Sequence, residues 1–324
     1  MPSAVSLAAS ALPEKFERDR AIDTFRGVLL ALMVIGNYLG QIQTVPVYLT
    51  HAQPLKGITV VDLGFPLFLF ILGLVLPGSL RRRLEHRGKW KTVYHFLKRY
   101  LLLILFGIAG NLVLGQPIFT NWSVLQSIGL AGLISLPFAF LAPAVRLVLG
   151  VGLVGLHQAI LNLGYQQWLL TNEQGDLAGI FGGFAWAGVI LIASFVGAGG
   201  KSICRALFSG LFFSLAGIFL SVWLPLTKPL ATASYTLFTI GLGGLGLTLF
   251  LILDRLVQVR LEHFVILGVN PLFVYMLAGV LSTLFARILP APAPLLMIAL
   301  AGAIYFLTFA AALLLYKRNW LLKL

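Results

Sequence analysis

The sequence predicts an all-α membrane protein, a polytopic bundle of about ten transmembrane helices. Hydrophobic residues make up 59% of the 324 residues and charged residues only 10%, whereas an ordinary soluble domain is about 25% charged. Apolar segments near twenty residues recur along the chain, and each can cross a hydrocarbon core of about 30 Å as a helix. Segments of about ten residues with alternating polarity, which are typical of membrane barrels, are absent from the sequence.

Ten apolar segments can be placed in order, and no soluble domain fits between them. We expect the chain to consist of a cytoplasmic tail at 1–23, a transmembrane domain at 24–316 and a second cytoplasmic tail at 317–324. The first tail lacks the basic start and sustained apolar core of a signal peptide. The predicted spans are 24–43, 59–79, 100–119, 123–142, 145–163, 177–198, 206–226, 230–253, 264–285 and 293–316.

The basic residues predict the orientation of these spans. An even number of spans puts both termini on one side, and Lys and Arg collect on the cytoplasmic side of membrane proteins. With a cytoplasmic N-terminus, 20 of the 23 Lys and Arg residues are cytoplasmic, and only Lys56, Lys228 and Arg287 face outward. Topology therefore explains the net charge of +13, so no nucleic-acid partner is expected.

The glycine patterns and the cysteine content predict no dinucleotide-binding site, no disulfide and no metal site. "GVGLVG" (150–155) and "GLGGLG" (241–246) match a dinucleotide-binding pattern, but that site needs a strand before its glycines. Both patterns lie inside apolar spans, where small residues let helices approach closely. The single cysteine, Cys204, excludes an internal disulfide. No pair of His or Cys has metal-ligand spacing, so no metal site is predicted.

Three polar residues are expected to meet at the outer membrane face. Asn37 lies in the first span, His51 in the first outer loop and Asp62 in the first turn of the second span. An imidazole can take and return a proton near neutral pH, and a nearby carboxylate can orient it. These residues predict a proton-handling site that suits a transferase or a proton-coupled transporter. A purely structural subunit would not need an ionisable cluster.

Several sequence blocks follow one another in order over nearly the whole chain. They are Asp23-Thr-Phe-Arg-Gly27, Asn37-Tyr38, His51-Ala52, Gly57-Ile-Thr-Val-Val-Asp62-Leu-Gly-Phe-Pro66, "VLQSIGL" (124–130), "PLTKPLATASYTLFTIGL" (225–242) and "LGVNPLFVY" (267–275). In content and order these blocks resemble the heparan-α-glucosaminide N-acetyltransferase family, of which this chain would be a bacterial relative without the lumenal domain.

The resemblance implies that 24–316 is an acyltransferase domain in a bacterial cytoplasmic (inner) membrane. It would move an acetyl group from cytosolic acetyl-CoA to an extracytoplasmic amino sugar or related glycan, by N- or O-acetylation. The family's catalytic histidine would correspond to His51 and its partner to Asn37. From the residues themselves, His51 would act as a general base or as a transient acetyl carrier, and Asp62 could orient either His51 or Lys56 and the backbone groups near it. The alternative is a proton-coupled transporter or flippase of a glycan or lipid-linked sugar.

Further polar residues are candidates for binding the donor and the acceptor. Arginine binds phosphate bidentately, so Asp23 and Arg26 at the cytoplasmic mouth of the first span, and the basic loop after the second span, are expected to hold coenzyme A. The same loop also fits ordinary positive-inside anchoring. Membrane lipid and a glycan acceptor are the expected partners, and a homodimer is compatible with the sequence. The loop's candidates are Arg81, Arg82 and Arg83, and those for the acceptor are Lys56, Gln126, Lys228 and Asn270.

Overall fold

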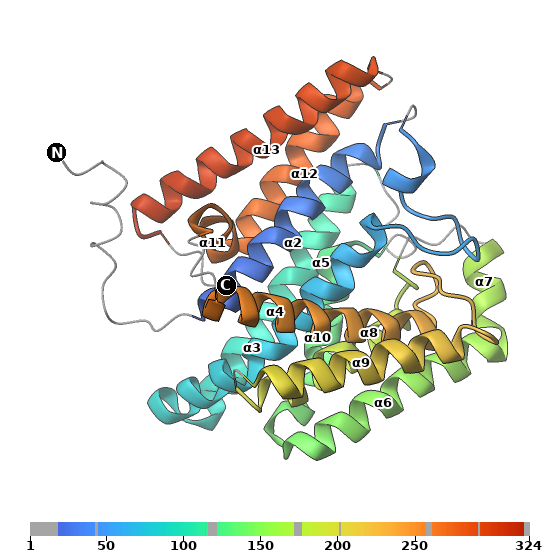
Figure 1. Ribbon diagram of the computed structural model, residues 1–324, viewed down its shortest axis with the longest axis vertical. Helices are drawn as coiled ribbons and strands as arrows, with labels where there is room; N and C mark the ends of the chain where they lie inside the picture. Colours follow the sequence, from blue (N-terminus) through green and yellow to red (C-terminus); the bar gives the residue numbers. More distant parts are fainter. Residues whose placement is uncertain are drawn as a thin grey trace.

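The part of the chain that the structure describes is an all-α bundle. The structure is a computed structural model that describes residues 19–42, 45–113, 115, 122–171, 177–200, 202–256, 261–290 and 292–320. Most of the first predicted tail, and the last four residues of the second, lie outside these ranges. The helices (Figure 1) are α2 (Arg20–Leu39), α3 (Gly64–Arg87), α4 (Lys89–Val113), α5 (Val124–Ser135), α6 (Pro143–Ile160), α7 (Gln166–Thr171), α8 (Gly182–Gly197), α9 (Ile203–Leu220), α10 (Ala233–Leu256), α11 (Glu262–Val269), α12 (Pro271–Ile288) and α13 (Pro294–Lys317).

The predicted fold class is confirmed. Eight helical segments among the described residues are long and apolar enough to cross a membrane, and α5 and α8 are shorter apolar helices. Each of the ten predicted spans overlaps one of these segments. Short turns complete the helical structure: η1 (Val47–Leu49), η2 (Val61–Leu63), η3 (Pro137–Phe140) and a wide turn, η4 (Leu161–Tyr165). The protein is therefore an integral membrane protein of the polytopic helical class.

Three predicted boundaries are wrong, each for a local reason. The span predicted at 264–285 is broken at Asn270, which leaves the helical region because Pro271 follows it. The span predicted at 123–142 is helical only to Ser135, and Pro137 begins the separate turn η3. The basic segment from Arg81 to Arg99, predicted as a loop, is helical except at Gly88. Gly88 adopts a φ of 74°, and this single residue makes the turn between α3 and α4.

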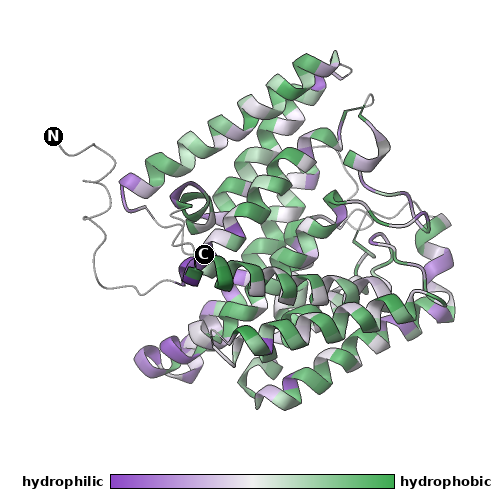
Figure 2. Ribbon diagram, in the orientation of Figure 1, coloured by the Kyte–Doolittle hydropathy of each residue, from purple (hydrophilic) through white to green (hydrophobic). Residues whose placement is uncertain are grey.

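Helix α8 forms the centre of the larger part of the bundle. Its sixteen residues include no charge, and most of them are buried. It packs against α3, α5, α6 and α10, while α9 packs on α10. Figure 2 shows that the helices are predominantly hydrophobic and that the end of the α3–α4 hairpin is strongly hydrophilic. This apolar centre holds the helices whose ends carry the polar candidates.

Helix α2 joins that centre to α11, α12 and α13. At its first turn the Asp23 backbone lies against Gly268 of α11. Close by, the Asn270 amide donates to the Trp320 carbonyl at 3.1 Å. The first and last described residues therefore lie at one end of the bundle, as an even number of crossings requires. The last turn of α2 and the first turn of α3 lie at the opposite end, where the candidate site is found.

Candidate active site

His51 lies where α2 ends. The chain leaves α2 at Leu39, and the segment that follows brings the His51 ring back against Gly40. Its Nδ1 lies 2.8 Å from Oδ1 of Asp62, just before α3. The His51 side chain is 29% exposed, and the part of the chain that the structure describes gives its Nε2 no hydrogen-bond partner. One ring nitrogen is therefore held by the protein, and the other is available to a reactant.

Asp62 is fully buried and is fixed through both carboxylate oxygens. Its Oδ2 accepts from the backbone N–H groups of Ala52 at 3.1 Å and Thr59 at 2.9 Å. The Thr59 hydroxyl lies 3.1 Å from the same oxygen and 2.7 Å from the Thr50 carbonyl. Backbone N–H groups can only donate, so Oδ2 must be an acceptor. The segment between His51 and Asp62 thus folds around the carboxylate that orients the histidine.

Lys228 completes this group from a distant part of the sequence. Its Nζ lies 3.0 Å from His51 Nδ1 and 3.6 Å from Asp62 Oδ1, and its side chain is only 5% exposed. A buried ammonium needs a counter-ion, and Asp62 provides one. The segment that carries Lys228 precedes α10, and Figure 1 shows its gold trace on the same side of the bundle as the blue segment after α2.

The carboxylate decides which tautomer His51 adopts. An unprotonated Nδ1 would turn its lone pair toward the Asp62 oxygen at 2.8 Å, so the proton belongs on Nδ1. Nε2 then carries the lone pair and can accept a proton. With its proton on Nδ1, His51 cannot accept from Lys228 there, so the Lys228 ammonium lies beside the ring as a charge whose counter-ion is Asp62. The geometry therefore suits a base that is held in one tautomer.

Tyr235 and Thr227 are supporting residues that the sequence analysis missed. The buried Tyr235 hydroxyl, in the first turn of α10, donates to the Asp62 carbonyl at 2.6 Å. The Thr227 hydroxyl oxygen accepts from the Leu55 backbone N–H at 3.3 Å. Both contacts join segments more than 170 residues apart, which no local pattern indicates. Thr59 could have been found, because the Thr59-x-x-Asp62 spacing resembles a helix-capping motif.

Asn37 lies one turn deeper than the histidine. It precedes Gly40 by three residues, so the two positions share a face of α2, and His51 packs against that face at Gly40. The Asn37 side chain pairs with Tyr275 of α12, and its carbonyl accepts from the Gln41 amide at 2.9 Å. The structure thus brings Asn37 to the same end of the bundle as His51.

The predicted donor residues lie at the opposite end. Arg26 donates to Asp23 at 3.2 Å and to the Gly268 carbonyl at 3.3 Å, which ties α2 to α11. The three arginines of α3 diverge: Arg81 pairs with Glu85, Arg82 donates to the Gly78 carbonyl, and Arg83 lines a separate cavity. Along α2, Asp23 and Gly40 are about 26 Å apart at 1.5 Å per residue.

The predicted acceptor residues are also divided by the fold. Lys228 contacts His51, and Lys56 is exposed in the turn that follows His51. Gln126 is buried in a capping box with Ser123 and accepts from Asn111 at 3.2 Å. Asn270 lies at the end of the bundle opposite His51, where it contacts Trp320. Of these four residues, the structure brings Lys228 into contact with the histidine, and Lys56 lies five residues after His51 in the chain.

Comparison with known proteins relates about a third of this chain to an N-acetyltransferase. Residues 18–120, which include Asn37, His51 and Asp62, match the family described as "Domain of unknown function (DUF5009)". A segment of 101 residues, 31% of this chain, is 42% identical to heparan-alpha-glucosaminide N-acetyltransferase of Homo sapiens and covers 14% of that protein. The same enzyme of Mus musculus is 41% identical over 93 residues, 28% of this chain and 13% of its own length. The matched segment of this chain is thus similar to a part of the heparan-alpha-glucosaminide N-acetyltransferases, in agreement with the resemblance of its sequence blocks, and it spans only about one seventh of their length.

Proposed function

We propose that this protein is a transmembrane acetyltransferase that moves an acetyl group from cytosolic acetyl-CoA to an extracytoplasmic amino sugar or related glycan. The observation that carries the proposal is the contact between His51 Nδ1 and Asp62 at 2.8 Å, which leaves Nε2 to act on a reactant. A histidine held in this way is the usual general base of acyl transfer. The shared segment with N-acetyltransferases supports the same reaction class.

In the proposed reaction, the acceptor amine or hydroxyl attacks the thioester carbonyl carbon while His51 Nε2 takes the acceptor's proton. The carbon–sulfur bond breaks, and the coenzyme A thiolate leaves and is protonated. Negative charge develops on the carbonyl oxygen, where the Asn37 amide and the Lys228 ammonium stabilise it. A transient acetyl group on Nε2 would use the same residues, and an acetylated His51 peptide in a rapid-quench digest would reveal it.

The donor is proposed to enter from the end of the bundle that carries Arg26. Coenzyme A bears several phosphate charges, which cannot cross hydrocarbon cheaply, so its head stays in the cytoplasm. Arg26 and Asp23 lie at that end of α2, and Gly40, against which His51 packs, lies at the other. We therefore propose that the thioester arm passes alongside α2. Lys56 and Lys228 are the proposed acceptor contacts beside His51.

A reconstituted assay tests this proposal. Purified protein in lipid vesicles is given radiolabelled acetyl-CoA on its cytoplasmic side and glucosamine on the other side. The expected product is acetylated glucosamine, and His51→Ala should lower its rate of formation by roughly 10²–10⁴-fold, because the general base is lost. His86→Ala is the matched control, because His86 is exposed near the end of α3 and should leave the rate unchanged.

Two results would count against the acetyltransferase. Undiminished product formation by His51→Ala would remove the histidine from the reaction. Movement of glucosamine across the vesicle without acetyl-CoA, driven by a proton gradient and lost in the same variant, would favour the transporter instead.

A further inference from the structure

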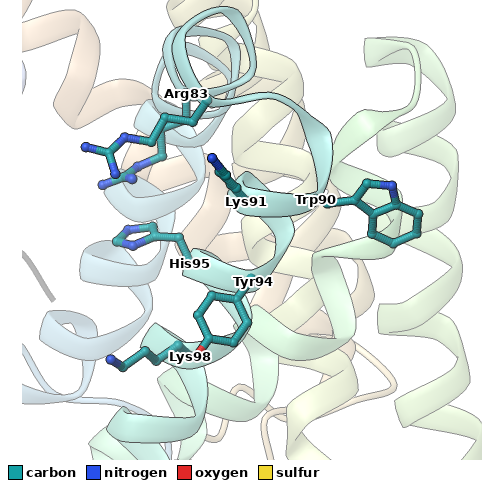
Figure 3. Close-up of a pocket in the computed structure, with 7 residues that line it drawn as sticks. Arg83, Trp90, Lys91, Tyr94, His95 and Lys98 are labelled. Atoms are coloured by element: carbon teal, nitrogen blue, oxygen red, sulfur yellow. The ribbon is translucent and has the colours of Figure 1, made fainter.

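A basic cavity lies at the joined ends of α3 and α4, away from the candidate active site. It has a volume of about 520 Å³. Figure 3 shows Arg83, His95 and Lys98 extending to one side of the hairpin, while Trp90 points the other way. Arg83, Arg87, Lys98 and Arg99 all lie close enough to His95 to interact with it electrostatically. The residues that line the cavity are Arg83, Arg87, Trp90, Lys91, Tyr94, His95 and Lys98, and none of them is acidic.

We propose that this cavity binds the headgroup of an anionic phospholipid. Four Arg and Lys side chains line it, and clustered basic side chains are the groups that bind phosphate. Trp90 is 82% exposed and Tyr94 is 66% exposed. Exposed Trp and Tyr side chains are typical of the level of lipid headgroups in membrane proteins.

The surface of α4 provides a place for the acyl chains. Lys91, Lys98 and Leu105 are spaced by seven residues, so they lie along one side of the helix. Beyond Lys98 this side is apolar and open, with Leu101 44% and Leu105 59% exposed. Helix α4 is one of the candidate membrane spans, and only 28% of its apolar window is buried. A lipid could therefore place its phosphate in the cavity and its chains along α4.

The same geometry favours a lipid over a soluble nucleotide. All seven lining residues belong to one helical hairpin. None comes from α2 or α10, the helices that carry or support the His51 site. The proposal does not rest on the acetyltransferase assignment, because lipid binding can be measured without turnover.

Native mass spectrometry of the purified protein in detergent tests the proposal. Phosphatidylglycerol is titrated against phosphatidylcholine, and the anionic lipid is expected to bind preferentially. Arg83→Gln/Lys91→Gln should weaken phosphatidylglycerol binding roughly tenfold or more, because two contacts to the phosphate are lost. The matched control, Arg81→Gln/Arg82→Gln, removes the same charge from neighbouring residues that do not line the cavity, and should bind as the wild type does.

Two soluble competitors and one single-residue variant distinguish a lipid site from a nucleotide site. Desulfo-CoA and glycerol phosphate should displace little phosphatidylglycerol, because they lack acyl chains to lie along α4. Displacement by desulfo-CoA that depends on Arg83 and Lys91 would make this a nucleotide site and overturn the lipid assignment. Equal weakening by the two double variants would show a diffuse charge effect and overturn it as well. Lys98→Gln, a change at an exposed position, should weaken binding in part and provides the test if the double variant fails to fold.

Discussion

At the scale of single residues, the site depends on the Asp62 carboxylate, which is buried and has polar partners at both of its oxygens. Asp62 is fully buried, and an unpaired charge there would be strongly destabilising. The Ala52 and Thr59 N–H groups occupy Oδ2, while His51 and Lys228 share Oδ1. Asp62 thus gives His51 its tautomer and Lys228 its counter-ion. This makes Asp62 a positioning residue that acts through its two neighbours.

The first prediction concerns that role. Asp62→Asn should lower the rate of acetyl transfer by roughly 10²–10⁴-fold. The NH2 group of the new amide can donate to His51 Nδ1, which moves the ring proton to Nε2 and removes the general base. In a His51→Ala background the same change should cost almost nothing further, because residues that act as a unit are non-additive. Steady-state rates of the wild type, the two single variants and the double variant measure this. Additive losses would show that Asp62 acts independently of His51.

At the scale of elements, the glycines of the two false dinucleotide patterns have different surroundings. In "GLGGLG" every glycine faces a neighbouring helix or side chain, and a Cβ on Gly244 would lie 2.7 Å from the Gly210 backbone of α9. The packing interpretation therefore holds for this pattern. In "GVGLVG" it holds for Gly150, against Ile192 of α8, whereas Gly152 and Gly155 have open space around them.

The second prediction follows from this difference. Gly244→Ala should force α9 and α10 apart and destabilise the protein by roughly 1–3 kcal/mol, the usual cost of overpacking. Gly152→Ala, the same change within α6, should be neutral or slightly stabilising, because alanine favours helix. Apparent unfolding temperatures in one detergent compare the two variants. A lower temperature for Gly152→Ala than for Gly244→Ala would contradict the assigned α9–α10 contact.

At the scale of the whole molecule, the structure groups residues by membrane side as the charge distribution predicts. Lys228 meets His51 at one end, and Arg146 lies close enough to Arg205 at the other to interact electrostatically. The end with Arg146 and Arg205 is the one predicted to be cytoplasmic. The charge distribution therefore predicts that the His51 end lies outside the cytoplasm.

The third prediction tests that orientation by labelling. Leu55 is 44% exposed four residues after His51, and Cys204 is exposed at the start of α9. In intact cells, a membrane-impermeant thiol reagent should label Leu55→Cys in a Cys204→Ser background. It should label wild-type Cys204 only after the cells are permeabilised. Labelling of Cys204 in intact cells would reverse the proposed topology.

The sequence by itself determined the membrane class, the approximate spans and the pairing of His51 with Asp62. These features depend on composition and on residues within about a dozen positions of each other. Only the tertiary structure brought Lys228 to His51 across 177 residues, because the packing of α2, α3 and α10 decides that contact. It also separated Arg81, Arg82 and Arg83, because successive side chains on a helix point about 100° apart. The tertiary structure also placed Gln126 and Asn270 away from His51. Both side chains form hydrogen bonds at helix ends, because buried polar groups need hydrogen-bond partners.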